Sequence, residues 1–267
     1  MRKILVLALA AVAVLALASV ALGANVYGVD GSTKPKGKGS VKKPLPIGLN
    51  FSYTVADENP ANRGTPIKVY AIASEGLVTF PQAFPTCTFS QANAETVSSK
   101  CKKAKVGSGL VQNVVGPAAS LTTKLFCNLN LNLYNISGAG KNGGMAIRLD
   151  GDPPAPTDVN SKAIGCPTPI HLAIKAKFVL TKIGGLPSDD LRFTVPPDLL
   201  HPSGLDNSVR NVVSKIQRKT AKIKYRGKKT KIGFYSAIGC KGGKRTIQAT
   251  FTDEQDDVKK ATKEKAC

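Results

Sequence analysis

The stretch LTTKLFCNLNLNLY (residues 121–134) alternates apolar and polar side chains. From Leu125 to Leu133 every odd position is Leu or Cys, and Asn128, Asn130 and Asn132 lie between them. Successive side chains of a β-strand point to opposite faces, so this period of two predicts a strand with one apolar face. Cys127 lies on the apolar face, where a buried disulfide sulfur is expected.

The same alternation recurs along the rest of the chain, in residues 47–55, 67–73, 145–149, 170–180 and 191–195. Gly and Pro separate these runs, as expected of turns between antiparallel strands. Many strands with one apolar face each must pack two layers together, which predicts an all-β, antiparallel β-sandwich over residues 47–267, with a jelly roll as one form of it. Two β domains divided near residues 185–205 are the alternative. Helical character is confined to residues 91–101, with Ser90 as the expected N-cap.

The N-terminal segment has a different composition from the rest. Arg2 and Lys3 precede an apolar run from Ile4 to Leu22, which ends in small residues. This order predicts a secretory signal peptide over residues 1–24, and an uncleaved membrane anchor is the alternative. Residues 25–46, rich in Pro, Gly and Lys, are expected to form an extended, solvated linker.

Six cysteines follow the signal segment. An even number in an exported chain predicts three disulfides, which stabilise mainly by restricting the unfolded chain. Six thiols allow 15 pairings. We favour pairing in chain order, because each bridge then closes a short or medium loop: Cys87–Cys101, Cys127–Cys166 and Cys240–Cys267.

The formal net charge is +21, and it is distributed unevenly. No acidic residue occurs between Asp206 and Asp253, whereas thirteen basic residues do. The simpler interpretation of such a segment is a solvated face whose like charges protect edge strands, and the functional interpretation is contact with an anionic cell-wall polymer or acidic polysaccharide. Lysine, a hydrated point charge, outnumbers arginine, and aromatic residues are few, so sequence-specific nucleic-acid binding is not expected. The candidate contact residues are Lys215, Arg218, Lys219, Lys222, Lys224, Arg226, Lys228, Lys229 and Lys231. Hairpin turns are expected near residues 226–228 and 241–243.

Catalytic and metal-binding signatures are missing from the sequence. It contains no HExxH, GxSxG or P-loop motif and no Cys-x-x-Cys pair, so we expect no catalytic residue, no metal and no cofactor. The two histidines, His171 and His201, are expected at the surface. The carboxylates of residues 253–257 are expected in a solvated turn.

Two groups of motifs carry a family resemblance. One is Ala83-Phe-Pro-Thr-Cys87 followed by Cys101-Lys-Lys-Ala-Lys-Val-Gly-Ser-Gly109. The other is Ser236-Ala-Ile-Gly-Cys240-Lys-Gly-Gly-Lys-Arg245 with Ala249-Thr-Phe-Thr-Asp253. Over most of residues 47–267 the chain resembles secreted proteins of high-G+C Gram-positive bacteria to which no activity is assigned. The resemblance implies export and cysteine pairing, and by analogy the bridge Cys87–Cys101.

The sequence therefore predicts an exported, non-catalytic β-protein of the cell envelope or medium, with a membrane contact only through an uncleaved signal segment. The alternative is a secreted hydrolase whose site the fold assembles from His171 or His201 and acidic partners.

Overall fold

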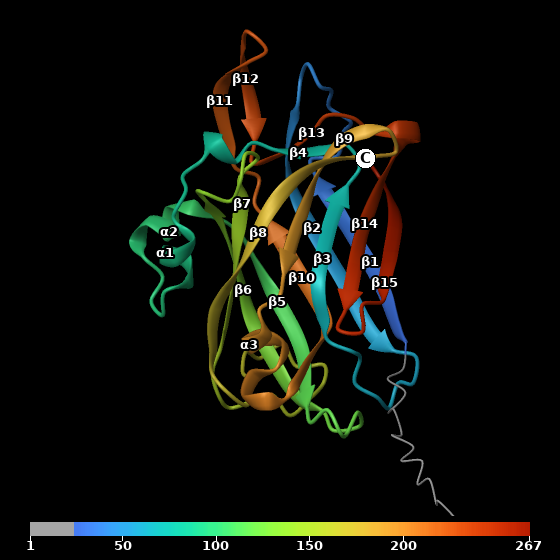
Figure 1. Cartoon of the computed structure of the whole chain (residues 1–267). Helices are drawn as coiled ribbons and strands as arrows, with labels where there is room; N and C mark the ends of the chain where they lie inside the picture. Colours follow the sequence, from blue (N-terminus) through green and yellow to red (C-terminus); the bar gives the residue numbers. More distant parts are fainter. Residues whose placement is uncertain (1–23) are drawn as a thin grey trace, which may run out of the picture.

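A computed structural model describes residues 24–267, so the predicted signal peptide lies outside the described residues except for Ala24. Strands account for most of the described chain (Figure 1). They are β1 (Asn25–Lys34), β2 (Leu45–Asp57), β3 (Ile67–Ser74), β4 (Leu77–Thr79), β5 (Lys105–Gly116), β6 (Leu125–Ile136), β7 (Gly144–Gly151), β8 (Ile170–Ile183), β9 (Leu186–Thr194), β10 (Asp206–Ile216), β11 (Thr220–Tyr225), β12 (Lys228–Gly233), β13 (Tyr235–Ala237), β14 (Lys244–Asp253) and β15 (Val258–Ala266). The helices are α1 (Phe89–Asn93), α2 (Ser99–Ala104) and α3 (Pro197–Leu200), with 3-10 turns at Pro81–Ala83, Pro202–Gly204 and Lys241–Gly243.

Thirteen of the strands form one antiparallel sheet, in the order β15-β14-β3-β9-β8-β7-β6-β5-β10-β2-β13-β4, with β1 on β2. The all-β, antiparallel prediction is confirmed. The alternative division into two β domains was placed near residues 185–205. Strands on both sides of these residues, such as β8 and β10, belong to the same sheet. Five consecutive strands, β5 to β9, are neighbours in a meander, which takes the place of the jelly-roll order considered from the sequence.

The two layers of the sandwich are two halves of this sheet, which folds over on itself. Tyr53 on β2 and Phe251 on β14 are far apart in the strand order, yet their rings lie 5.4 Å apart. Tyr27 on β1 stacks on Phe251 at 4.5 Å, and Tyr70 on β3 packs edge-on against it at 5.7 Å. Figure 1 shows β1 and β2 behind β3 and β14. The apolar core lies between these layers.

The run that predicts the fold forms β6. Its odd positions Cys127, Leu129, Leu131 and Leu133 are buried in the core, as expected. The strand begins only at Leu125, because residues 117–124 turn around the guanidinium of Arg63, which donates to the carbonyls of Ser120 and Thr123.

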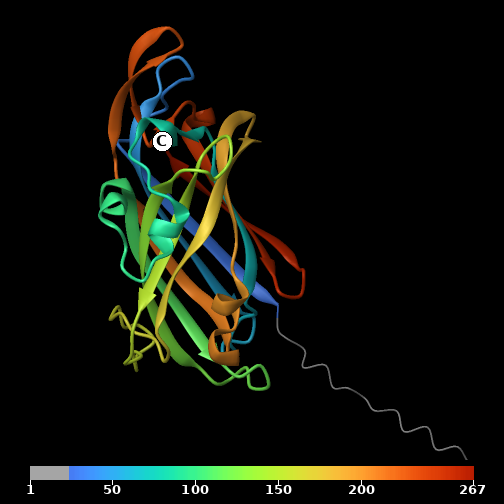
Figure 2. The same cartoon turned by 60° about the vertical axis from the view of Figure 1, so that its left-hand side comes forward.

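The outer face of β6 and β7 is covered as well. Tyr134, Ile136 and Ala146 form a second apolar cluster beneath α1 and α2, and Cys87–Cys101 closes this cover. Figure 2 brings this side of the molecule forward. Arg148, which is 1% exposed, donates from its guanidinium to the carbonyls of Ala94 and Glu95 at 2.9 and 3.2 Å, and so ties the cover to β7.

The three disulfides are those expected from pairing in chain order: Cys87–Cys101, Cys127–Cys166 and Cys240–Cys267. No described cysteine is free. Cys240–Cys267 holds the end of β15 beside the start of β14, and Cys127–Cys166 holds residues 152–166 against β6.

The linker predicted over residues 25–46 is wrong for its first ten residues. Asn25–Lys34 form β1 and pair with β2 along their whole length. Tyr27 and Val29 pack on the core, and the Asn25 side chain exchanges hydrogen bonds with the backbone of Thr65. The strand forms although it contains glycine and lysine. Its backbone groups pair with those of β2, and its Tyr27 and Val29 side chains leave water for the core.

The single helix predicted over residues 91–101 is also wrong. α1 begins earlier, because Thr88 rather than Ser90 is the N-cap, in a capping box with Gln91. Ala94 is extended (φ −62°, ψ 149°) and ends α1, and α2 starts at Ser99. The turn expected at residues 241–243 is a 3-10 turn between β13 and β14, and the hairpin β14–β15 turns at residues 254–257 instead. No helix within residues 24–267 combines the length and the apolar character that crossing a membrane requires.

We expect Phe251→Ala to lower the free energy of unfolding by about 3–5 kcal/mol, because it removes a ring at the centre of the contact between the layers. Urea denaturation measures the change. Val258→Ala on neighbouring β15, where the side chain is 63% exposed, is the control and should change stability by less than about 0.5 kcal/mol. Equal effects of the two substitutions would contradict the packing described.

Candidate functional site

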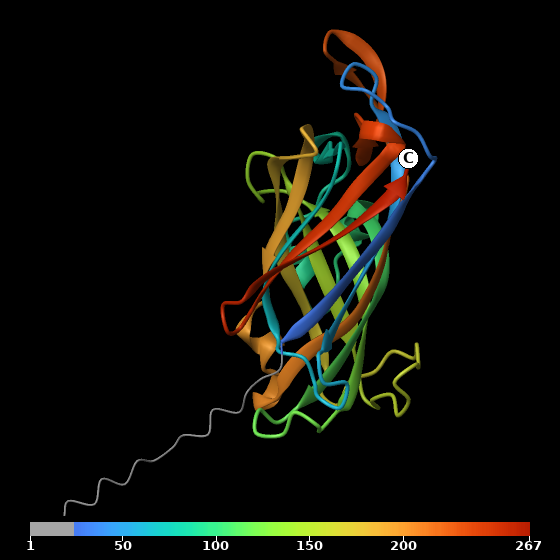
Figure 3. The same cartoon turned by 90° about the vertical axis from the view of Figure 1, so that its right-hand side faces the viewer.

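The basic segment forms a hairpin that stands apart from the large sheet. β11 and β12 pair only with each other among the described strands, and they project beyond the end of the sandwich (Figures 1 and 3). Arg226 and Gly227 make the turn with φ of 49° and 80°. Positive φ at both central residues is typical of the two-residue turn whose twist suits a hairpin. The hairpin turn predicted near residues 226–228 is therefore confirmed.

One face of this hairpin presents two pairs of lysines. Lys222 lies directly opposite Lys231, and Lys224 directly opposite Lys229, and all four are exposed. Like charges in such positions destabilise a pair of strands. Within residues 24–267, none of the four forms an ion pair with a carboxylate. The hairpin thus gathers four ammonium groups that no nearby acid neutralises.

The other face of the hairpin packs toward the body. Ile232 is fully buried, and the ring of Tyr225 lies edge-on to Phe80 at 5.6 Å. The guanidinium carbon of Arg226 lies 5.8 Å from the Tyr225 ring centroid, within range of a cation–π contact. Because these contacts bury the face that carries Ile232 and Tyr225 against the sandwich, the opposite face with the paired lysines is exposed to solvent.

The structure separates the nine predicted contact residues into three groups. Six belong to the hairpin or its turn and are exposed: Lys222, Lys224, Arg226, Lys228, Lys229 and Lys231. Arg218 and Lys219 instead donate to the carbonyls of Pro46 and Lys103 at 3.1 and 3.4 Å, and burial lowers the pKa of Lys219. Lys215 is exposed on the outer face of β10.

No pattern in residues 35–43 indicated that they lie beside this hairpin. Val41, Tyr225 and Arg226 line one cleft of about 320 Å³, which places that loop beside the hairpin. The loop adds four exposed lysines to the same end of the molecule: Lys36, Lys38, Lys42 and Lys43. Asp189 is the one carboxylate among the described residues that line this cleft, and it is 8% exposed. It accepts hydrogen bonds from the backbone N–H and the hydroxyl of Thr79, and burial raises its pKa.

His171 lies between two carboxylates on the outer face of the sheet. Its Nε2 lies 2.8 Å from Asp152 and its Nδ1 3.2 Å from Asp150, whose same oxygen accepts from Arg148 at 2.7 Å. The hydrogen bond to Asp152, and then that to Asp150, raise the pKa of His171 above its ordinary 6.5.

His201, which follows α3, is placed similarly. Its Nε2 lies 2.6 Å from Glu254 and its Nδ1 3.1 Å from Asp206, which also pairs with buried Arg63 at 3.1 Å. The three groups could be arranged around a cation, since their ligand atoms lie within 4.8 Å of one another. As they stand, the distances are those of hydrogen bonds, and they join α3 to the β14–β15 turn.

Neither histidine is arranged as a general base. In a catalytic triad one ring nitrogen bonds the orienting carboxylate and the other accepts a proton. Here both nitrogens of each ring are bonded to carboxylates. The structure thus brings each histidine to acidic partners, as the hydrolase alternative required, but leaves neither ring a nitrogen free of a carboxylate.

No family model matches the chain, and no curated protein does. Among solved structures, the T6 backbone pilin of serotype M6 Streptococcus pyogenes is similar at 11% identity with a TM-score of 0.27. The match covers 90% of this chain and 36% of that one, so the chain spans about a third of the pilin's length. A TM-score this low does not establish a shared fold.

We expect the His171 pKa, followed by NMR titration, to lie above 6.5, and Asp152→Asn to lower it. Because the folded pKa is raised, the stabilisation is fully present below pH 6.5, the unfolded value, and is lost as the pH rises through the folded value. Urea midpoints across this range, compared with those of His171→Ala, measure the stability change. A wild-type pKa at or below 6.5 would contradict the two-carboxylate arrangement.

Proposed function

We propose that the chain is an exported, non-catalytic β-protein of the cell envelope or medium that binds an anionic polysaccharide or wall polymer through the β11–β12 hairpin. The observation that carries the proposal is the pairing of Lys222 with Lys231 and of Lys224 with Lys229 on one exposed face, where no carboxylate of residues 24–267 forms an ion pair with them. That arrangement costs stability in the free protein. A polyanion would relieve the repulsion, because it neutralises both lysines of each pair.

The chemistry of the hairpin suits a repeating polymer better than a small anion. Alternate residues on one strand face are separated by about 6.6–6.8 Å. The four lysines therefore form a grid of point charges rather than one converging pocket. Lysine offers no planar fork for bidentate recognition, so such a surface favours charge density over a defined sequence. Binding would be driven by release of counterions from the polymer and would weaken steeply with salt.

The proposed location rests on the cysteines and the N-terminal segment. All six cysteines are paired, and disulfides persist mainly outside the cytosol. Residues 1–24 have the composition of an export signal. The resemblance to secreted proteins of high-G+C Gram-positive bacteria agrees with this location.

The test uses four Lys→Gln substitutions, at Lys222, Lys224, Lys229 and Lys231. Heparin and poly(glycerol phosphate) are the probes, and dissociation constants are measured by titration over a range of salt concentrations. We expect roughly a tenfold or larger loss of affinity at low salt. The slope of log affinity against log salt should fall by about 4, about 1 for each lysine.

The matched control changes four exposed lysines elsewhere: Lys162, Lys175, Lys177 and Lys182 to Gln. It lowers the net charge by the same amount, so its affinity should stay near that of the wild type if the hairpin is the site. If both variants lose affinity equally, binding depends on net charge alone and the hairpin is not the site. If the wild type is not retained on heparin at low ionic strength, the proposed function fails.

A further inference from the structure

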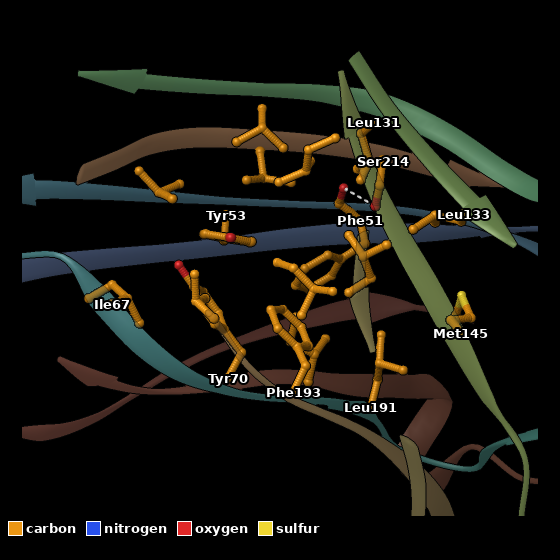
Figure 4. Close-up of a pocket in the computed structure, with 18 of the residues that line it drawn as sticks. Phe51, Tyr53, Ile67, Tyr70, Leu131, Leu133, Met145, Leu191, Phe193 and Ser214 are labelled. Atoms are coloured by element: carbon orange, nitrogen blue, oxygen red, sulfur yellow. Dashed lines mark hydrogen bonds between the residues drawn. The ribbon is translucent and has the colours of Figure 1, made fainter. Parts of the chain in front are cut away.

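An apolar cavity of about 120 Å³ lies between the two layers of the sandwich. Its wall comes from strands of both layers and from α3, and it includes Phe51, Leu131, Met145, Leu191 and Phe193 (Figure 4). Protein interiors are close-packed, with few voids larger than a water molecule. An engineered apolar cavity of about 150 Å³ is large enough to bind benzene. The cavity of this protein is somewhat smaller than that one, so a single ring is about the largest apolar body that it could hold.

Two asparagines give this cavity a polar end. Asn113 on β5 and Asn207 on β10 line it and are only 3% and 6% exposed. Asn113 lies opposite Val209 and Asn207 lies opposite Val115, so the two amides are diagonal neighbours on the same inner face. The Oδ1 of each has no hydrogen-bond partner among the described residues. The Nδ2 of Asn207 donates to the carbonyl of Leu199 at 2.7 Å, which fixes its oxygen as the free atom.

The other polar groups of the wall do not serve these oxygens. The Ser214 hydroxyl donates to the carbonyl of Phe51 at 3.2 Å (Figure 4). The hydroxyls of Tyr53 and Tyr70 lie next to each other (Figure 4). A buried acceptor without a donor is costly, so the polar end favours a guest that brings a hydrogen-bond donor.

We propose that this cavity binds a small, mostly apolar alcohol, with its aromatic or aliphatic body between the layers and its hydroxyl donating to Asn113 or Asn207. An ammonium group would also donate, but burying its charge is costly, and Asp189, the one carboxylate among the described residues of the wall, already accepts two hydrogen bonds from Thr79. A hydroxyl supplies the donor without that cost. The site is separate from the lysine hairpin, none of whose residues line it.

The probes are benzyl alcohol and anisole, which are isomers with and without a hydroxyl donor. Both are titrated into the full mature protein and followed by isothermal titration calorimetry. Anisole is the more apolar isomer, so burial alone would favour it. We expect saturable, one-to-one binding of benzyl alcohol that is about 3- to 10-fold tighter than that of anisole. In Asn113→Leu this preference should shrink or reverse while anisole still binds.

Val212→Phe places a ring in the cavity and should abolish binding of both probes; circular dichroism and the melting temperature establish that it is folded. The hairpin variant with four Lys→Gln changes should bind both probes like the wild type. The proposal is overturned if the wild type shows no saturable binding of benzyl alcohol, or if a folded Val212→Phe variant binds it unchanged. If Val212→Phe does not fold, Asn113→Leu decides: an unchanged alcohol-to-ether ratio overturns the proposal.

Discussion

The structure depends on one constraint: a single sheet of thirteen strands has to bury its apolar face against itself. No large helix is available among the described residues to cover that face, since α1, α2 and α3 are four to six residues long. The sheet therefore folds until β1 and β2 meet β3 and β14 across a cluster of aromatic rings. Tyr27, Tyr53, Tyr70 and Phe251 make the contact between the layers, and β1 reaches β15, where Asp30 pairs with Lys265 at 2.7 Å.

This constraint also explains where the candidate sites lie. Strands that share the core alternate apolar and polar residues. In β11 and β12 lysines alternate with only a few apolar residues, and these two strands lie outside the large sheet. The repulsion between paired lysines is therefore confined to a hairpin that projects from the large sheet. Between the layers the side chains do not fill all of the space, and the polar end of the cavity lies where two asparagines replace apolar residues on the inner face.

The sequence predicted the features that depend on local pattern. The alternation in residues 121–134 identified β6, and the preference for short or medium loops identified the three disulfides. It did not predict β1, because the Gly, Lys and Pro content of residues 25–46 outweighs the short alternation of Tyr27 and Val29. The pairing of each histidine with two carboxylates joins residues far apart in the chain, as with His201 and Glu254. The cavity and the position of residues 35–43 beside the hairpin likewise depend on how the sheet folds over.

Hydrogen–deuterium exchange, measured on the oxidised protein with and without poly(glycerol phosphate), tests the separation of a rigid core from an external basic hairpin most directly. Amides of β2, β6, β7 and β14 should exchange slowest and be unaffected by the polymer. Those of β11 and β12 should exchange faster in the free protein and become protected when the polymer is bound. Slow exchange of β11 and β12 in the free protein, or protection by the polymer spread over the core strands, would contradict the account.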